Sequence, residues 1–136
     1  MVIFADTSGL YPLLDAENMA FESVAPVWEH LRDGGYSIVT TNYVLVETAT
    51  LLQSRLGVGA VRDFVDGVVP VLSVEWVDPR VHEGGLAAVL AANRRDLSFV
   101  DCVSFEVMRR LGIRRAFALD GHFREQGFEC VPQTDL

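Results

Sequence analysis

Lysine is absent from this chain of 136 residues, so each of its 11 basic residues is an arginine. It has two cysteines, Cys102 and Cys130, which are too few and too far apart for a disulfide framework or a zinc site. No apolar run approaches the roughly 20 residues that a membrane-spanning helix needs. The N-terminus lacks the positively charged lead of a signal peptide. We therefore expect a cytoplasmic protein with two buried cysteines and no membrane contact.

Positive charge is also scarce, because 19 acidic residues outnumber the arginines and give a formal net charge of −8. Acidic proteins are poor non-specific binders of nucleic acid, since contacts with phosphate normally come from Lys and Arg. Bound divalent cations would cancel part of this charge, and the planar guanidinium of arginine suits phosphate well. A compositional bias of the source genome explains the arginines equally well. The charge therefore argues mildly against a nucleic-acid partner without excluding one.

Half of the residues are hydrophobic and 22% are charged, which indicates a folded domain. Short apolar runs predict strands at residues 2–5, 37–40, 71–74, 116–119 and 128–131. Apolar residues at helical spacing predict helices, one after Asp6 with Thr7 or Ser8 near its cap, and others at residues 21–31, 42–56, 58–69, 79–93 and 98–111. Neither a repeat nor a linker interrupts the pattern, so we predict a single domain over residues 1–136.

The alternation of strands with helices predicts an α/β fold with a central parallel sheet of four to five strands, covered on both faces. Crossover connections between parallel strands are right-handed, which limits where the helices can lie. Ligands of such sheets bind beyond the carboxyl ends of the strands. The residues that follow each predicted strand are therefore the first candidates for a functional site.

Two acidic residues follow predicted strands directly, Asp6 after the first and Asp120 after the fourth. Either one could instead cap the next helix or turn. Glu47 lies at the edge of an apolar helical stripe with no arginine within one turn, where losing its hydration would be costly without a cation. Asp101 stands three residues after Ser98, the spacing of a capping box.

The hypothesis of a metal site depends on these four acids as a set, because the topology can bring all of them to one edge of the sheet. Two like charges about 4 Å apart repel by about 4 kcal/mol at an effective dielectric constant near 20. Several converging carboxylates therefore favour a hard divalent cation, and ligation by oxygen alone suits Mg²⁺ or Mn²⁺. The sequence offers no set of His and Cys ligands of the kind that zinc prefers.

Four ordered segments resemble the acidic motifs of PIN domains, in particular those of VapC-type toxins. They are Asp6-Thr7-Ser8, the stretch 42–48 around Glu47, Ser98-Phe99-Val100-Asp101, and the stretch 118–123 around Asp120. The resemblance extends over essentially the whole chain. It implies a three-layer α/β/α sandwich. It also implies hydrolysis of phosphodiester bonds in structured RNA, either transfer RNA or ribosomal RNA, by water activated at one or two Mg²⁺ or Mn²⁺ ions.

The resemblance also implies roles for particular residues. Asp6, Glu47, Asp101 and Asp120 would be the catalytic metal ligands, with the hydroxyls of Thr7 and Ser98 orienting them or a bound water. We expect contacts with RNA from clustered arginines and a neighbouring histidine: Arg94, Arg95, Arg109, Arg110 and His122. The family further implies a VapB-like antitoxin as partner, and a homodimer that uses Trp28, Tyr43 or Phe64 if they are exposed.

Three alternatives remain open at this point. Haloacid-dehalogenase-like phosphatases also place an Asp after the first strand, but Asp6-Thr7-Ser8-Gly9 lacks their second Asp. A PIN-like module could bind RNA or protein without cutting, although every acidic position of the family is present. A housekeeping RNA-processing nuclease would keep the chemistry without the toxicity.

Overall fold

The computed structural model describes residues 1–133, so the last three residues of the predicted domain lie outside it. The described residues form one five-stranded sheet in the order β3-β2-β1-β4-β5, and every strand pairing in it is parallel. The strands are β1 (Val2–Ala5), β2 (Ser37–Thr41), β3 (Leu72–Glu75), β4 (Arg115–Phe117) and β5 (Glu129–Val131). The predicted parallel sheet is confirmed, with β1 at its centre.

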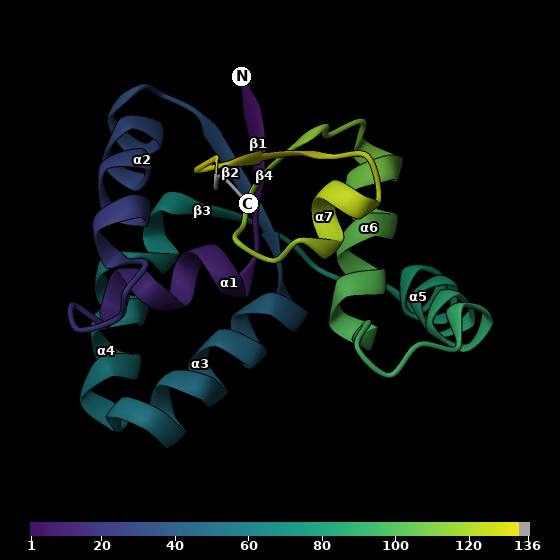
Figure 1. Cartoon of the computed structure of the whole chain (residues 1–136), viewed down its shortest axis with the longest axis horizontal. Coiled ribbons are helices and arrows are strands. Elements are labelled where there is room, and N and C mark those ends of the chain that lie inside the picture. Colours follow the sequence, from purple (N-terminus) through teal and green to yellow (C-terminus); the bar gives the residue numbers. More distant parts are fainter. Residues whose placement is uncertain (134–136) are drawn as a thin grey trace.

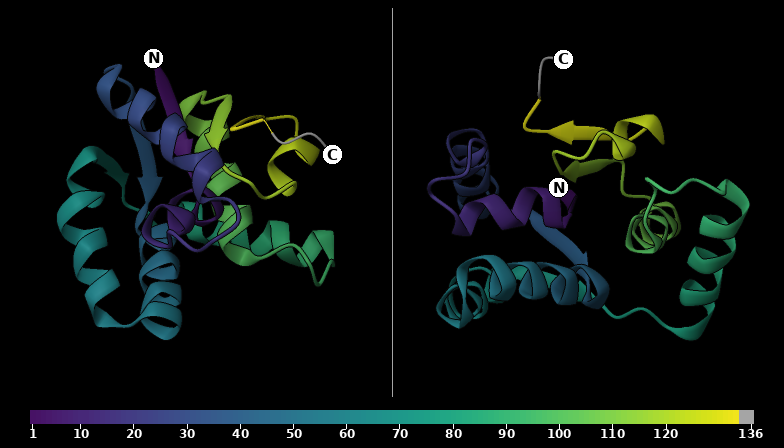
Figure 2. Two further views of the ribbon diagram at one scale, coloured as in Figure 1. Left: turned by 60° about the vertical axis from the view of Figure 1, so that its left-hand side comes forward. Right: turned by 60° about the horizontal axis from the view of Figure 1, so that its bottom comes forward.

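Helices cover both faces of this sheet. Those of the described chain are α1 (Thr7–Leu10), α2 (Phe21–Asp33), α3 (Asn42–Leu56), α4 (Val58–Gly67), α5 (Pro79–Ala92), α6 (Phe99–Leu111) and α7 (His122–Glu125), with 3₁₀ turns η1 (Tyr11–Leu14) and η2 (Val69–Val71). Helices α1 to α4 lie on one side and α5 to α7 on the other (Figure 1). Helix α5 is the outermost of its group and packs against α6 (Figure 2). The predicted three-layer sandwich is thereby confirmed.

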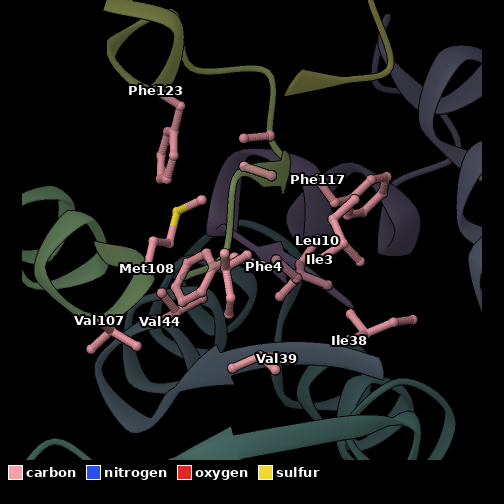
Figure 3. Packing of buried hydrophobic residues seen from close by; sticks show 14 of the residues in the cluster. Ile3, Phe4, Leu10, Ile38, Val39, Val44, Val107, Met108, Phe117 and Phe123 are labelled. Carbon is pink, nitrogen blue, oxygen red and sulfur yellow. The ribbon is translucent and has the colours of Figure 1, made fainter. Parts of the chain in front are cut away.

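The side chains of β1 alternate between the two layers of helices, as the period of a strand requires. Phe4 points towards Met108 of α6 and Phe123 of α7, whereas Ile3 points towards Leu10 of α1 (Figure 3). The rings of Phe4 and Phe123 are stacked with centroids 6.4 Å apart. Because Ile3, Phe4 and Ala5 of β1 are fully buried between these layers, the backbone at the carboxyl end of the strand is held in a fixed position.

The fourth strand is shorter than predicted, since β4 ends at Phe117 and not at residue 119. The backbone N–H groups of Leu119 and Asp120 donate to the hydroxyl of Ser8, at 2.9 and 3.1 Å, and so leave the ladder of the sheet. Asp120 therefore follows the strand after two further residues and not directly, as predicted. The acid still lies at the same edge of the sheet.

Other boundaries shift for local reasons. Asp6 itself caps α1, by accepting from the backbone N–H of Ser8, so neither Thr7 nor Ser8 is the cap. Helix α4 ends at Gly67, and the 3₁₀ turn η2, with Pro70 inside it, delays β3 by one residue. Helix α7 was not predicted, because its four residues are too few to show a helical period.

Burial settles two further expectations. Cys102 and Cys130 are both free and buried, as predicted. Trp28 and Phe64 are 6% and 1% exposed and belong to the hydrophobic core, so they do not meet the condition of exposure that a contact with a second copy requires. Within residues 1–133, no helix combines the length and the apolar character that crossing a membrane would require.

Candidate metal centre

Asp6 stands at the carboxyl end of the central strand and is only 3% exposed. One carboxylate oxygen, Oδ2, accepts hydrogen bonds from the backbone N–H of Ser8 at 3.1 Å and from its hydroxyl at 2.7 Å. The other oxygen, Oδ1, is buried and has no hydrogen-bond partner among the described residues. An unpartnered buried carboxylate oxygen is costly unless a proton or a cation satisfies it.

The pKa of Asp6 reflects this position. The pKa is raised to about 7, chiefly by burial and also by the nearby charges of Asp101 and Glu47, while the hydrogen bonds from Ser8 act in the opposite direction. Without a cation, Asp6 therefore holds its proton up to nearly neutral pH. A divalent ion at Oδ1 would replace that proton.

Ser8 connects two of the acids. Its hydroxyl donates to Asp6 and accepts from the backbone N–H groups of Leu119 and Asp120, so it joins the start of α1 to the segment after β4. The sequence analysis missed this residue. The available signal was a hydroxyl two residues after an Asp at a strand end, a spacing common in capping turns.

Thr7 lines the cleft with the acids, but its hydroxyl contacts α3. Its hydroxyl is 2.9 Å from that of Thr48 and 3.5 Å from the carbonyl oxygen of Val44, both on α3. It therefore ties α1 to the helix that carries Glu47 and contacts no carboxylate among the described residues. Ser8, and not Thr7, therefore holds a carboxylate in this structure, while the predicted role of Thr7 towards a bound water stays a prediction.

We expect Ser8→Ala to lower both stability and activity. The change leaves two backbone N–H groups without their acceptor, which costs about 1–3 kcal/mol, and frees Asp6 and Asp120 to move apart, which should weaken metal binding and cleavage by about 10–100-fold. Thermal unfolding and metal titration measure the two effects. Ser23→Ala, at an exposed position on α2, is the matched control. A Ser8→Ala protein with unchanged metal affinity would contradict this role.

Asp101 and Ser98 form the predicted capping box at the start of α6. The hydroxyl of Ser98 accepts from the backbone N–H of Asp101 at 3.0 Å, and Oδ2 of Asp101 accepts from the backbone N–H of Ser98 at 3.3 Å. The hydroxyl of Ser98 therefore holds the backbone of Asp101, while the backbone N–H of Ser98 contacts the carboxylate of Asp101. Asp101 is 7% exposed. Burial and then the charge of Asp120 raise its pKa.

His122 lies among the acids of the site. Its Nδ1 is 2.9 Å from Oδ1 of Asp120 and 3.6 Å from Oδ2 of Asp101, and its Nε2 is 3.3 Å from Asp96. Burial lowers the pKa of His122, but the contacts with Asp96, Asp120 and Asp101 together outweigh this and raise it. One ligand atom from each of Asp101, Asp120 and His122 lies within 4.8 Å of the others.

All four predicted acids line one cleft of about 590 Å³. Asp6 and Asp120 come from the carboxyl edge of the sheet, Glu47 from α3 and Asp101 from α6, so one side of the cleft belongs to each layer of helices. Glu47 is half-buried, as is Asp120. This acidic cluster, with one carboxylate oxygen lacking a partner among residues 1–133, could hold a divalent metal ion.

The arginines predicted to contact RNA do not line the cleft. Arg94 forms ion pairs with Asp96 and Glu125, and Arg110 pairs with Glu106 at 2.8 Å. Arg109 donates to Gln126 at 2.8 Å and stacks over the rings of Phe105 and Phe128, while Arg95 is exposed on a different part of the surface. The cleft instead contains an arginine that the sequence analysis overlooked, Arg55.

Comparison with known proteins agrees with this geometry. The family model of the PIN domain matches residues 3–129. The chain belongs to the PIN-domain family, whose members are metal-dependent nucleases. Membership of this family argues against a haloacid-dehalogenase-like phosphatase. The presence of all four acids in one cleft argues against a module that binds RNA or protein without cutting.

Individual relatives show which PIN-domain proteins this chain is similar to. The 23S rRNA-specific endonuclease VapC20 of Mycobacterium tuberculosis is 35% identical over 128 residues, which cover 93% of this chain and 95% of that protein. The crystal structure of VapC20, a sarcin-ricin loop cleaving toxin, matches with a TM-score of 0.83 at 34% identity and covers 93% and 95% of the two chains. The predicted resemblance to VapC-type endoribonucleases is confirmed.

A more distant structure shares the fold alone. It is that of VapBC2 from Rickettsia felis bound to a DNA fragment from their promoter, which matches with a TM-score of 0.70 at 12% identity over 96% of this chain and 97% of that one.

Proposed function

We propose that this chain is a Mg²⁺- or Mn²⁺-dependent endoribonuclease, the toxin of a toxin–antitoxin pair, which cuts a structured loop of ribosomal RNA. The observation that carries the proposal is the convergence of four carboxylates, from both layers of helices and the sheet edge, on one cleft. The specificity of VapC20, which is similar over nearly its whole length, favours ribosomal RNA over the transfer RNA that the sequence also left open.

Asp6, Glu47, Asp101 and Asp120 would hold the ion or ions. When bound, the metal supplies Lewis acidity, which lowers the pKa of a water molecule and neutralises charge on the phosphate. Ser8 keeps Asp6 and the segment before Asp120 at a fixed separation. A protonated His122, 2.9 Å from Asp120, offsets part of the repulsion between Asp101 and Asp120 before the ion binds.

Control of such an enzyme would come from a VapB-like antitoxin. The open acidic cleft favours a partner segment with a basic side chain, which could take the place of the cation and block access of RNA. We further propose that residues 1–136 act as one PIN domain and that the protein forms a homodimer, with the half-buried Tyr43 the remaining aromatic candidate for the contact.

Mapping of RNA ends tests the proposed reaction. We expect purified protein with Mg²⁺ or Mn²⁺ to cut ribosomal RNA at one dominant site in a loop, and to leave 5′-phosphate and 3′-hydroxyl ends because water attacks the phosphorus and the 3′ oxygen leaves. Ligation that requires a 5′-phosphate, followed by sequencing, identifies the new ends, with the Asp101→Asn protein as control. A 2′,3′-cyclic phosphate, or cuts spread evenly over all RNA, would contradict the proposal.

A further inference from the structure

The charge of the cleft changes along its length. Glu47, Leu51 and Arg55 line it at intervals of four residues along α3, so one face of this helix borders the cleft. Eight residues of α-helix span about 12 Å. Among the described residues that line the cleft, Arg55 is the one arginine, and its backbone lies about that far along α3 from Glu47.

Arg55 is held in place without being neutralised. Its guanidinium lies over the ring of Tyr11, 5.3 Å from the centroid. Tyr11 is 6% exposed, and its hydroxyl donates to Asp15 at 3.4 Å, so the ring is a fixed platform only five residues after Asp6. Arg55 has no carboxylate partner within residues 1–133, unlike Arg94 and Arg110.

We propose that Arg55 binds a phosphate of the RNA strand near the one that is cut, and so sets the register of the strand in the cleft. The inference rests on the proposed ribonuclease function. A guanidinium that stacks by its face leaves its N–H groups available at the edge, where they can bind phosphate oxygens in pairs. Asn18, which lines the same cleft, offers a further amide donor.

This position predicts which kinetic constant depends on Arg55. A contact with a phosphate other than the reacting one is made equally in the bound substrate and in the transition state. Its loss should therefore raise KM and leave kcat nearly unchanged. The alternative is a purely structural role. Arg55 lies in the last turn of α3, where a cation stabilises the helix dipole, and loss of that interaction would lower stability without changing KM.

The test compares Arg55→Ala, Arg55→Lys and the matched control Arg62→Ala, an exposed arginine on α4 that does not line the cleft. The substrate is a synthetic RNA hairpin that spans the cleavage site mapped with the wild-type protein. We expect Arg55→Ala to raise KM by about 10–100-fold with kcat changed less than about twofold. Arg55→Lys should fall between, and Arg62→Ala should match wild type.

Neutral methylphosphonates, placed one at a time along the hairpin, identify the phosphate. We expect one position, outside the scissile phosphate, at which the substitution weakens the wild-type enzyme but not Arg55→Ala. The slope of log KM against log salt concentration should also be smaller by about one in Arg55→Ala than in wild type.

Several outcomes would overturn the role of Arg55. They are an unchanged KM, equal sensitivity of both proteins to every methylphosphonate, and a lower melting temperature with unaltered RNA kinetics, which would assign Arg55 to the helix dipole. Weaker binding of the antitoxin with normal RNA kinetics would assign it to the protein partner instead. A wild-type protein that cuts no RNA would overturn the proposed function itself.

Discussion

Asp101→Asn is expected to reduce RNA cleavage by about 10³-fold or more while leaving the protein folded. Asparagine has nearly the same shape and keeps an oxygen that can accept from the N–H of Ser98, so the capping box survives. It removes a charge that lies in the cleft with Asp120 and that burial already makes unfavourable, as the raised pKa of Asp101 shows. Single-turnover cleavage and thermal unfolding measure the two consequences.

The matched control is Asp66→Asn, an exposed acid on α4 outside the cleft, which changes net charge equally. It should cleave at the wild-type rate. Because Asp101→Asn relieves repulsion between carboxylates, its melting temperature without metal should equal or exceed that of wild type. Cleavage by Asp101→Asn at the wild-type rate would remove this residue from the site.

Removal of divalent metal should abolish cleavage, and the activity restored by limiting Mn²⁺ should increase with pH through about 7. The pKa of Asp6 is raised to about 7 by burial, and the ion must displace its proton. At limiting metal we therefore expect a rate about tenfold lower at pH 6 than at pH 8. A rate that is flat over this range in limiting metal would contradict the assignment of Asp6.

The same titration affects stability in the metal-free protein. Because the folded state keeps the Asp6 proton up to about pH 7 and the unfolded chain loses it near pH 3.8, the free energy of unfolding should fall as pH rises between these values. The change should amount to at most about 4 kcal/mol. Asp6→Asn should remove it, which urea unfolding at several pH values can measure.

Much of the fold follows from local patterns in the sequence. The short apolar run 2–5 and the helix from Asn42 to Leu56, which Thr41 caps, are evident in the sequence, and the structure reproduces their bounds. The alternation of strands and helices then permits few topologies, since crossovers must be right-handed. The grouping of four acids at one cleft could be anticipated because the carboxyl ends of parallel strands share an edge.

The details that were missed depend on contacts between segments far apart in the chain. β4 ends early because Ser8, 111 residues before Leu119, takes the backbone donors of the following segment. No pattern within residues 116–119 reports that bond. Thr7 and Ser8 are adjacent hydroxyls of similar character, and only the direction of each side chain separates the one that holds a carboxylate from the one that holds α3.

The arginines show the same limit. Pairs such as Arg94-Arg95 attract attention in a sequence, but Arg94 is neutralised by Asp96 and by Glu125, which is 31 residues away. Arg55 is isolated in the sequence, and its proposed role depends on the ring of Tyr11 and on the cleft that α3 borders. Clustering of charge in the sequence therefore says little about which cation is available to a ligand.

Calorimetric titration of Mn²⁺ into the purified protein at pH 8 tests most directly whether these side chains form one metal-binding pocket. Wild-type protein should bind one or two ions with release of protons. The double variant with Asp6→Asn and Asp101→Asn should bind none. Equal heats of binding in the two proteins, or none in wild type, would contradict the account.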